Sequence, residues 1–486
     1  MSAAHTGPLP RHVVVVGGGI SGLAAAWFLT SGGVPRVTVL EASSRLGGKL
    51  YADEIAGVPV DLGAESMLAR RPEAVGLARA VGLADALQPP ATANASLWTR
   101  GALRPMPKGH LMGVPGDLGP VAASGVISPA GLARIPLDHL LPRTPVEDDV
   151  AVGAFVEARL GREVVDRLVE PLLGGVYAGN AHEISMRAAV PKLFEIARSP
   201  HRSLIAGVRE ELHRAAARTR DAGPVFLGIE GGVGRLPQAV AEACRAAGAQ
   251  VRTGTEARAL RRTASGWQVE TSAPHGTEVL DADAVVLSVP AAAASRLLSS
   301  EAPGAAAELA PVEYASMALV TMAFRRRDLA VQPRGSGFLV PPVDGRTIKA
   351  STFSSVKWGW VGDADPDVLV LRTSVGRHGE EADLLRDDTD LVRLSRHDLG
   401  EAIGLTAAPV AARVTRWDRG LPQYPVGHLD RVARIRAHVA GLPGLQVCGA
   451  LYDGVGIPAC IGSARRAADA LLEGTPGTGA GGGAGQ

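Results

Sequence analysis

The chain has 486 residues, more than one ordinary hydrophobic core accommodates, so its length predicts two or three subdomains. Its 50 Lys and Arg residues almost balance its 49 Asp and Glu residues. This balance argues against the basic surface field that drives binding to nucleic acids. The hydrophobic share of 46% is ordinary for a globular protein, and composition alone indicates no function.

Neither a secretory signal nor a membrane span is expected. The N-terminal residues lack an apolar segment with a cleavage site. The least polar long tract, residues 111–135, is interrupted by Asp117, Pro and Gly and cannot supply roughly 20 consecutive apolar helical residues. Cys244, Cys448 and Cys460 have no metal-like spacing, so we expect buried thiols in a reducing, cytoplasmic setting, with neither a disulfide nor a zinc site. Residues 474–486, GTPGTGAGGGAGQ, are expected to form a disordered tail.

The first fifty residues predict a dinucleotide site. A β-branched run, HVVVV (residues 12–16), precedes Gly17, Gly19 and Gly22 in G-x-G-x-x-G spacing, and an Ala-rich helix should begin near Ile20. In this pattern the first glycine allows a tight turn, the second allows a pyrophosphate to approach, and the third allows helix and strand to pack closely. The N-terminus of the helix then faces the phosphate charge.

A second strand-like run, RVTVLEA (residues 36–42), supplies the expected acid. Glu41 follows Gly22 by about 19 residues, the spacing of the carboxylate that binds a ribose hydroxyl. A carboxylate at this place argues against a 2′-phosphate, so the residues leave FAD and NAD open and disfavour NADP.

Three further segments resemble the FAD-dependent amine oxidase superfamily, to which the porphyrinogen oxidases belong. SSRLGG (residues 43–48) resembles the segment after the ribose-binding acid, DLGAESM (61–67) resembles the segment that passes the flavin ring, and VCGALYDGVGIPACIG (447–462) resembles the segment that closes on the flavin. The competing interpretation of each is an ordinary turn, or a strand, turn and helix without a ligand. The resemblance implies FAD as the cofactor, bound by Gly17, Gly18, Gly19, Ile20, Ser21, Gly22, Glu41, Ala42, Arg45, Gly48, Lys49, Gly63, Ala64, Glu65, Ser66, Ala257, Trp417, Gly449, Val455, Gly456 and Ile457.

Residues 226–260 are not expected to form a second nucleotide site. Gly232 and Gly234 are followed by Pro237 where a third glycine would be needed. The segment instead resembles the returning strand and helix of the FAD domain, which places Ala257 at the adenine. Without a site for a nicotinamide nucleotide, oxygen or a quinone becomes the expected oxidant of the flavin.

The middle of the chain is identified as a member of the protoporphyrinogen and coproporphyrinogen oxidase family. The resemblance is carried by VGAFVEARLGREVVDRLVEPLLGGVYAGNAHEISMRAAVPKLFEI (residues 152–196) and RWDRGLPQYPVGH (416–428). It implies that residues 175–179 line a tetrapyrrole cavity, although glycines there also suit the end of a helix. The implied substrate-binding residues are Glu65, Arg71, Gly175, Val176 and Tyr177; no catalytic side chain and no metal are implied.

The resemblance implies oxidation of coproporphyrinogen III to coproporphyrin III in haem biosynthesis. Six electrons pass through flavin N5 to O2, giving H2O2, with a methylene bridge held about 3 to 3.5 Å from N5. Glu65 resembles the acidic choice of Gram-positive enzymes, which favours this substrate over protoporphyrinogen IX, the main alternative. Candidate cations for the propionates are Arg70, Arg71, Arg187, Lys192, Arg346 and Lys349. Other haem-pathway enzymes are candidate partners, and the oligomeric state is not indicated.

The expected fold class is α/β, with a Rossmann-like FAD-binding domain, a substrate-binding sheet domain and an α-helical insertion. The FAD-binding domain is expected from residues 11–90, 224–292 and 413–473, the insertion from 91–223 and the sheet domain from 293–412. An amine oxidase or a carotenoid desaturase would keep the fold, but 5 Tyr and 7 Phe are few for the aromatic cage of an amine oxidase. A flavin-binding haem-pathway protein without turnover is the non-enzymatic alternative.

Overall fold

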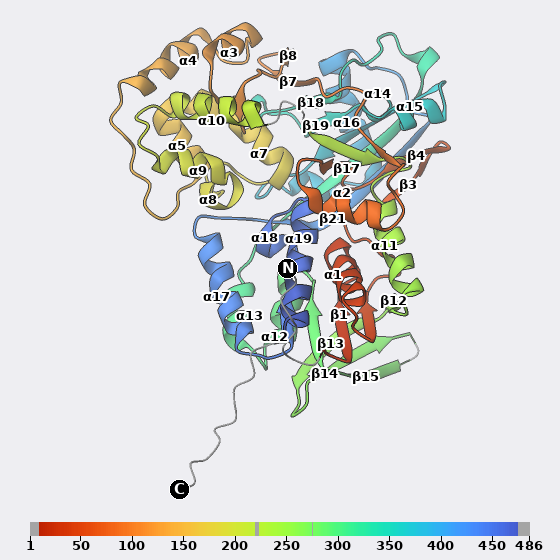
Figure 1. Cartoon of the computed structure of the whole chain (residues 1–486). Coiled ribbons are helices and arrows are strands. Elements are labelled where there is room, and N and C mark those ends of the chain that lie inside the picture. Colours follow the sequence, from red (N-terminus) through yellow and green to blue (C-terminus); the bar gives the residue numbers. More distant parts are fainter. Residues whose placement is uncertain (1–8, 219–222, 275, 475–486) are drawn as a thin grey trace.

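The computed structural model describes residues 9–218, 223–274 and 276–474 (Figure 1). The predicted tail therefore lies outside the described residues, apart from Gly474. In Figure 1 the helices of residues 118–218 lie beside a large sheet in the upper half of the molecule. A smaller parallel sheet with its helices fills the lower half.

The parallel sheet has five strands in the order β12-β2-β1-β16-β22. Its strands are β12 (Gln250–Arg252), β2 (Arg36–Leu40), β1 (His12–Val16), β16 (Ala284–Leu287) and β22 (Leu445–Val447). β1 is central, and Val13, Val14 and Val15 are fully buried, as expected for a parallel strand covered on both faces. The predicted Rossmann-like fold class is confirmed.

Alternate residues of β1 face two different cores. Val13 and Val15 pack with α1 (Ile20–Ser31), α11 (Arg235–Ala246) and α19 (Ile457–Leu472). Val14 and Val16 face a core that includes the antiparallel sheet of β13 (Glu256–Arg262), β14 (Trp267–Ala273) and β15 (Gly276–Ala282). The same core takes residues from α12 (Ala291–Leu298), α13 (Pro303–Leu309), α17 (His428–Ala440) and α18 (Ala450–Asp453). Both faces of the parallel sheet are therefore covered.

The large sheet has seven strands in the order β21-β17-β20-β19-β18-β7-β8. They are β21 (Ala411–Pro422), β17 (Tyr314–Arg325), β20 (Val368–Val375), β19 (Ile348–Thr352), β18 (Gly337–Leu339), β7 (Ala95–Thr99) and β8 (Ala102–Pro105). Only the pair of β18 and β7 is parallel. The mostly apolar runs SMALVTMAF (residues 316–324) and VLVLRTSV (368–375) have the composition of strands and lie in β17 and β20.

Smaller elements connect these sheets. The described short strands are β3 (Ala52–Ile55), β4 (Val58–Asp61), β5 (Met67–Leu68), β6 (Leu87–Gln88), β9 (His110–Leu111), β10 (Val114–Pro115) and β11 (Phe226–Ile229). The remaining helices outside the helical region are α2 (Pro72–Ala80), α14 (Ser354–Lys357), α15 (Gly359–Ala364) and α16 (Asp388–Ile403). β11 pairs with both β5 and β6, so residues 226–229 return to the chain segment that follows the predicted flavin-facing loop.

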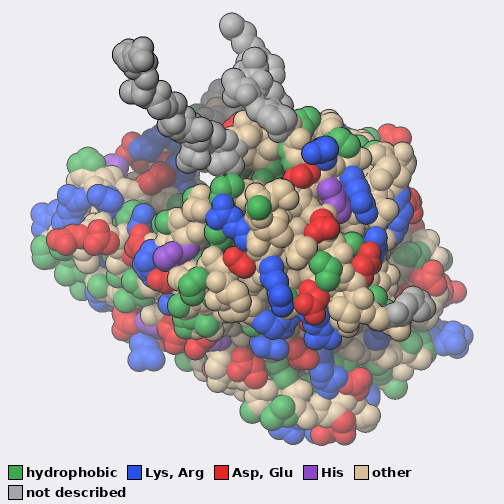
Figure 2. All heavy atoms as spheres, turned by 90° about the horizontal axis from the view of Figure 1, so that it is seen from below, with side chains coloured by type: hydrophobic (Ala, Val, Ile, Leu, Met, Phe, Trp, Pro, Cys, Tyr) green, Lys and Arg blue, Asp and Glu red, His purple; other side chains and the backbone are tan. Residues whose placement is uncertain are grey.

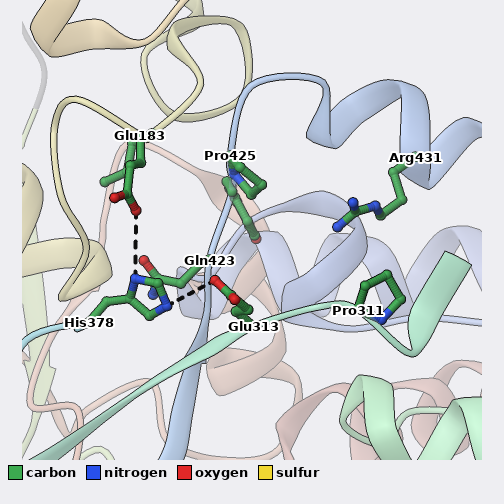
Figure 3. Close-up of a pocket in the computed structure, with 9 residues that line it drawn as sticks. Glu183, Pro311, Glu313, His378, Gln423, Pro425 and Arg431 are labelled. Atoms are coloured by element: carbon green, nitrogen blue, oxygen red, sulfur yellow. Dashed lines mark ion pairs between the residues drawn. The ribbon is translucent and has the colours of Figure 1, made fainter. Parts of the chain in front are cut away.

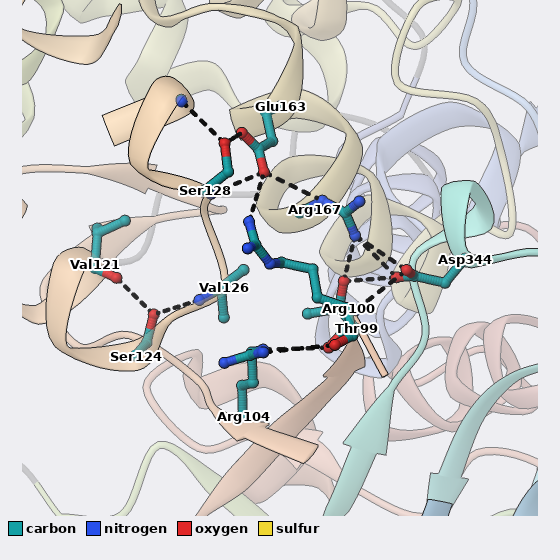
Figure 4. A network of polar contacts seen from close by, with 11 residues as sticks. Thr99, Arg100, Arg104, Val121, Ser124, Val126, Ser128, Glu163, Arg167 and Asp344 are labelled. Atoms are coloured by element: carbon teal, nitrogen blue, oxygen red, sulfur yellow. Dashed lines mark hydrogen bonds and ion pairs between the residues drawn. The ribbon is translucent and has the colours of Figure 1, made fainter. Parts of the chain in front are cut away.

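The helical region contains α3 (Leu118–Ser124), α4 (Pro129–Arg134), α5 (Val152–Leu160), α6 (Arg162–Val164), a π-helical turn (Val165–Val169), α7 (Glu170–Tyr177), α8 (Met186–Ala189), α9 (Pro191–Arg198) and α10 (Leu204–Arg218). A polar network joins it to the large sheet (Figure 4). Arg167 donates to Thr99 Oγ1 at 2.5 Å and to the Asp344 carboxylate at 3.1 Å. Glu163 accepts from Ser128 N at 2.9 Å, which fixes the start of α4.

The seven-stranded sheet includes strands from outside residues 293–412, the range expected for the substrate-binding domain. β7 and β8 come from within the range expected to be helical, and β21 begins at Ala411 and crosses the expected boundary at 413. The boundary at 293 lies inside α12, whose buried face belongs to the core beneath the parallel sheet. We keep the division into three units as a proposal, with β7, β8 and β21 assigned to the sheet unit.

Charges of both signs are interspersed on the face shown in Figure 2. No helix within the described ranges has the length and hydropathy needed to cross a membrane. The three cysteines are buried free thiols. Within the described part of the chain, no group of three His, Cys, Asp or Glu side chains is arranged to hold a metal ion.

Candidate functional site

The glycine turn after β1 leaves an open space beside a helix N-terminus. Gly17 has φ of 110°, and a Cβ on Gly22 would lie 1.8 Å from the Gly17 carbonyl oxygen, so helix α1 and the strand meet without room for a side chain. By contrast, a Cβ on Gly19 would meet nothing within 4 Å. The backbone therefore forms a cradle that a phosphate can enter at the N-terminus of α1.

Glu41 follows β2 and borders the same turn. Its carboxylate accepts from Gly18 N at 2.8 Å and from Ser43 N at 2.8 Å, which fixes its side chain across the loop. Thr255 N donates to Glu41 O at 2.8 Å, so the chain that enters β13 runs beside the acid and leads to Ala257 two residues later. This arrangement leaves room for the predicted ribose at Glu41 and adenine near Ala257 to be tested, and both contacts stay predictions.

Arg45 bonds to its own loop. Its guanidinium donates to Gly48 O at 2.6 Å and Leu46 O at 3.0 Å, and it lies 4.4 Å from the centre of the Tyr51 ring. The side chain thus fixes the curvature of residues 45–50 next to the cradle. Its predicted contact with the cofactor stays a prediction.

Lys49 provides a free cation at the cradle. Lys49 is exposed, and desolvation by surrounding protein atoms lowers the pKa of its ammonium. No hydrogen-bond or ion-pair partner for Lys49 is found among the described residues. The loop of residues 45–50 lies against the glycine turn after β1, because a Cβ on Gly48 would lie 3.4 Å from Gly19 Cα.

The C-terminal glycine-rich segment closes on the same place. A Cβ on Gly449 would lie 3.7 Å from Ser21 Oγ, and Gly449 N donates to Ser463 Oγ at 3.0 Å. Gly456 is exposed at the N-terminus of α19. Two helix N-termini and the ammonium of Lys49, for which the described part of the chain provides no partner, therefore border one open space, and this donor set fits the pyrophosphate of an FAD molecule.

Residues 61–66 cross from the cradle toward the large sheet. A Cβ on Gly63 would lie 2.1 Å from Lys49 O, so the two segments are in backbone contact. Trp417 Nε1 donates to Leu62 O at 3.0 Å, and Arg372 donates to Gly63 O at 2.7 Å. Ala64 is exposed although the residues before and after it are buried. The structure thus brings the predicted residues Gly63, Ala64 and Trp417 together.

Glu65 is buried and paired with two cations. One carboxylate oxygen contacts Lys357 Nζ, and the other lies 2.9 Å from the Arg372 guanidinium. Burial acts to raise the pKa of the Glu65 carboxyl, but Arg372 and Lys357 together hold that pKa below its ordinary value. Glu65 is therefore an anion, and both of its oxygens are already engaged.

Asp61, four residues earlier, is buried in a different way. Burial raises the pKa of its carboxyl to about 7, against the opposing effect of bonds from Val233 N at 3.0 Å and Gly234 N at 3.1 Å. These two donors lie at the N-terminus of α11. The carboxylate links the flavin-facing segment to that helix.

The raised pKa of Asp61 predicts a pH-dependent stability. The folded-state pKa of Asp61 lies above its ordinary value of 3.8, so the protonated carboxyl stabilises the folded state. This stabilisation is complete below pH 3.8 and is lost as the pH rises through about 7. Between pH 5 and pH 8 this group should lower the free energy of unfolding by about 2 to 3 kcal/mol. We expect Asp61→Asn to reduce this pH dependence in urea unfolding, whereas Asn at the exposed Asp85 should preserve it. Equal pH dependence in wild type and Asp61→Asn would show that Asp61 is not the group responsible.

The predicted substrate residues around α7 have different exposures. Gly175 and Val176 are exposed, whereas Tyr177 is 8% exposed and packs against Tyr424, with ring centres 5.5 Å apart. The helix ends at Tyr177, and Ala178 follows with φ of 49°. The glycines therefore do precede a helix end, and a substrate surface can be offered only by the first two residues. Tetrapyrrole binding there stays a proposal.

Most candidate cations have carboxylate partners. Arg187 pairs with Asp430 at 3.1 Å, Lys192 pairs with Glu195 at 2.7 Å, Arg346 contacts Glu401, and Arg71 pairs with Glu73 at 2.6 Å. Lys349 is buried, and its ammonium donates to Gly376 O at 2.7 Å. Arg70 is exposed, with no carboxylate partner in the described ranges. Of these, Arg70 and Arg71 lie closest in sequence to the flavin-facing segment.

Sequence reasoning missed Arg372 and Lys357. The signal for Arg372 is visible, since one arginine interrupts the apolar run VLVLRTSV of β20. Sequence reasoning also missed a cavity of about 250 Å³ near the end of α7 (Figure 3). There His378 lies 3.7 Å from Glu183 and 3.2 Å from Glu313, and these side chains come from segments far apart in the sequence.

Comparisons with known proteins agree with this geometry. Residues 20–472 match the family model described as flavin containing amine oxidoreductase. The coproporphyrinogen III oxidase of Mycobacterium tuberculosis is 37% identical, over 96% of this chain and 98% of the relative. That of Bacillus subtilis is 33% identical, over 95% and 98%.

Solved structures share the fold. A protein of Exiguobacterium sp. 255-15, provisionally named protoporphyrinogen oxidase, superposes with a TM-score of 0.82 at 32% identity, covering 95% of this chain and 98% of that one. Cyclohexylamine oxidase of Brevibacterium oxydans, at 18% identity and a TM-score of 0.67, shows the same fold. The chain belongs to the family of flavin-containing amine oxidoreductases, and FAD is its cofactor.

Proposed function

We propose that this chain oxidises coproporphyrinogen III to coproporphyrin III. The observation that carries the proposal is the match to coproporphyrinogen III oxidases of two bacterial genera over 95 to 96% of the chain, at 33 to 37% identity. The cradle for FAD and the exposed basic residues Arg70 and Arg71 near its flavin-facing segment support it. A cytoplasmic location is part of the proposal.

The reaction removes six electrons in three two-electron oxidations, and each reduces one O2 to one H2O2. Bound FAD would supply the hydride acceptor. The chain's own residues bind and orient: the N-termini of α1 and α19 and Lys49 would hold the pyrophosphate, and Glu41 would hold the ribose. We assign no side chain as catalytic acid or base.

Porphyrin fluorescence tests the proposal. The purified holoenzyme is given coproporphyrinogen III and protoporphyrinogen IX side by side under air, with H2O2 and O2 measured in parallel. We expect a higher kcat/KM for coproporphyrinogen III and one H2O2 for each O2 consumed. A higher kcat/KM for protoporphyrinogen IX would overturn the substrate assignment.

Protoporphyrinogen IX is the second candidate substrate. A protoporphyrinogen oxidase of Bos taurus is 31% identical over 95% of this chain. A relative named for the other substrate is therefore almost as similar to this chain as the coproporphyrinogen III oxidase of Bacillus subtilis. The two substrates differ in charge, since coproporphyrinogen III carries four propionates and protoporphyrinogen IX carries two. Cationic residues near the site should therefore discriminate between them.

Arg71→Ala is expected to raise KM for coproporphyrinogen III about tenfold, from the loss of a charge-assisted hydrogen bond worth roughly 1.5 kcal/mol. Arg71 is exposed on the N-terminal side of α2, where, among the carboxylates of the described ranges, its guanidinium contacts only Glu73. Arg79→Ala, at the exposed far end of the same helix, is the matched control and should leave KM unchanged. An unchanged KM in Arg71→Ala would remove Arg71 from the substrate site.

A further inference from the structure

Three successive carbonyl groups of the flavin-facing segment are held by side chains of the large sheet. Arg372 donates to Asp61 O at 3.1 Å and to Gly63 O at 2.7 Å. Trp417 Nε1 donates to Leu62 O at 3.0 Å between them. The carbonyl oxygens of residues 61–63 therefore point toward β20 and β21, and the chain reaches Ala64 exposed to the open site.

Arg372 makes these contacts from a buried position. Its side chain is 11% exposed and comes from β20, the third of the seven strands. Besides the two carbonyls, its guanidinium binds the Glu65 carboxylate at 2.9 Å, so one planar group spans residues 61 to 65. An arginine is suited to this because its five donors are fixed in one plane. A lysine offers a single point of attachment.

Glu65 serves this arrangement as a counter-ion. A buried guanidinium needs a charge partner, and Glu65 is 8% exposed with both oxygens engaged. Lys357, at the end of α14, contacts the other oxygen and is 19% exposed. Both oxygens of Glu65 therefore contact protein cations, and its predicted contact with the substrate stays a prediction.

We propose that Arg372 is a positioning residue of this oxidase. It orients the backbone of residues 61–65 against the cofactor, and Glu65 and Lys357 complete its charge balance. The inference deepens the proposed function and rests on it only for the turnover measurement. Arg372 has no assigned contact with the substrate, so its loss should act on kcat rather than on KM.

Four variants separate this role from a merely structural one. Arg372→Met should bind FAD but show a shifted flavin absorption spectrum, and its kcat should fall about 100-fold with KM changed less than threefold, the scale expected for a misplacement of about 1 Å. Arg372→Lys should recover only part of kcat, because it cannot reach both carbonyls and Glu65. Lys357→Met removes the second cation of Glu65 but leaves Arg372 paired with Glu65 and bound to the carbonyls, so its kcat should fall less than that of Arg372→Met and its KM should not rise. Arg416→Met, on β21 two strands away from β20 in the same sheet and with an exposed partner at Asp388, is the matched control and should be unchanged.

Two results would overturn the inference. One is an unchanged flavin spectrum with normal kcat in Arg372→Met. The other is a rise in KM in Lys357→Met that exceeds, as a fold-change, the fall in kcat in Arg372→Met. Such a result would indicate that the ammonium of Lys357 binds the substrate. The spectrum is recorded without porphyrinogen. A failure of the proposed substrate would therefore appear as inactive wild-type enzyme while the spectral comparison stays informative.

Discussion

Gly22→Ala is expected to abolish FAD binding and to destabilise the nucleotide-binding part of the chain. A Cβ at this position would lie 1.8 Å from the Gly17 carbonyl oxygen and 2.5 Å from Ser288 Oγ. The first contact is with backbone, which cannot rotate away. Helix α1 would have to move off the end of β1, and this would open the turn whose backbone forms the phosphate cradle.

Gly17 cannot relieve the strain. Its φ of 110° is unfavourable for other residues, and its own Cβ position is 2.7 Å from Ser288 O. The turn is therefore confined from both sides, and overpacking of this kind costs roughly 3 kcal/mol or more. The measurements are flavin absorbance per protein after purification and the thermal unfolding midpoint.

Gly76→Ala is the matched control for Gly22→Ala. Gly76 is also a helical glycine, in α2, but it is exposed and its Cβ would meet nothing within 4 Å. Alanine there should keep FAD and add about 0.5 to 1 kcal/mol of stability, since it removes only backbone entropy from the unfolded chain. Stoichiometric FAD in Gly22→Ala would contradict the steric argument.

Local sequence predicted those parts of the site in which neighbouring residues determine the geometry. The turn at Gly17, the start of α1 at Ile20 and the place of Glu41 after β2 all depend on spacings within one strand, turn and helix. The large sheet was predicted only in part. β17 and β20 are mostly apolar runs, whereas β7 joins β18 across more than 200 residues, and no local pattern specifies that pairing.

The charged contacts behind residues 61–65 could not be predicted for a similar reason. Glu65 looks like an available acid in the sequence, and only the fold brings Arg372 from β20 and Lys357 from α14 to its two oxygens. Tyr177 is a related case, because its burial depends on Tyr424, a residue from the distant segment that follows β21. The sequence shows which chemical groups a segment offers, but it does not show which distant residues bind them in the fold.

Arg159→Met is expected to destabilise the helical region by about 3 to 5 kcal/mol, the effect of removing one partner of a buried ion pair. Arg159 is 2% exposed and Asp138 is fully buried. Arg159 donates to Asp138 Oδ1 at 2.6 Å and to the carbonyls of Pro142 and Arg202 at 2.6 and 2.7 Å. Methionine fills the volume but leaves the carboxylate and these carbonyls without their donor. Hydrogen exchange of α5 and urea unfolding measure the loss.

Arg159 and Asp138 connect α5 to the chain segments before and after it. The loss of stability in Arg159→Met should therefore appear first in these segments. Asp138 retains bonds from Ser203 Oγ at 2.6 Å and Ile205 N at 3.1 Å, and its uncompensated charge is then the main cost. Arg159→Met/Asp138→Asn removes that charge while keeping an acceptor, and it should therefore be more stable than Arg159→Met alone.

Arg162→Met is the exposed control. The side chain of Arg162 is 76% exposed and pairs with Asp166 at 3.3 Å, so its loss should change stability by less than about 0.5 kcal/mol. FAD content should stay at the wild-type level in all three variants, because Arg159 makes no contact with the cradle. A double variant less stable than Arg159→Met would show that hydrogen bonding, and not the buried charge, sets the stability of this region.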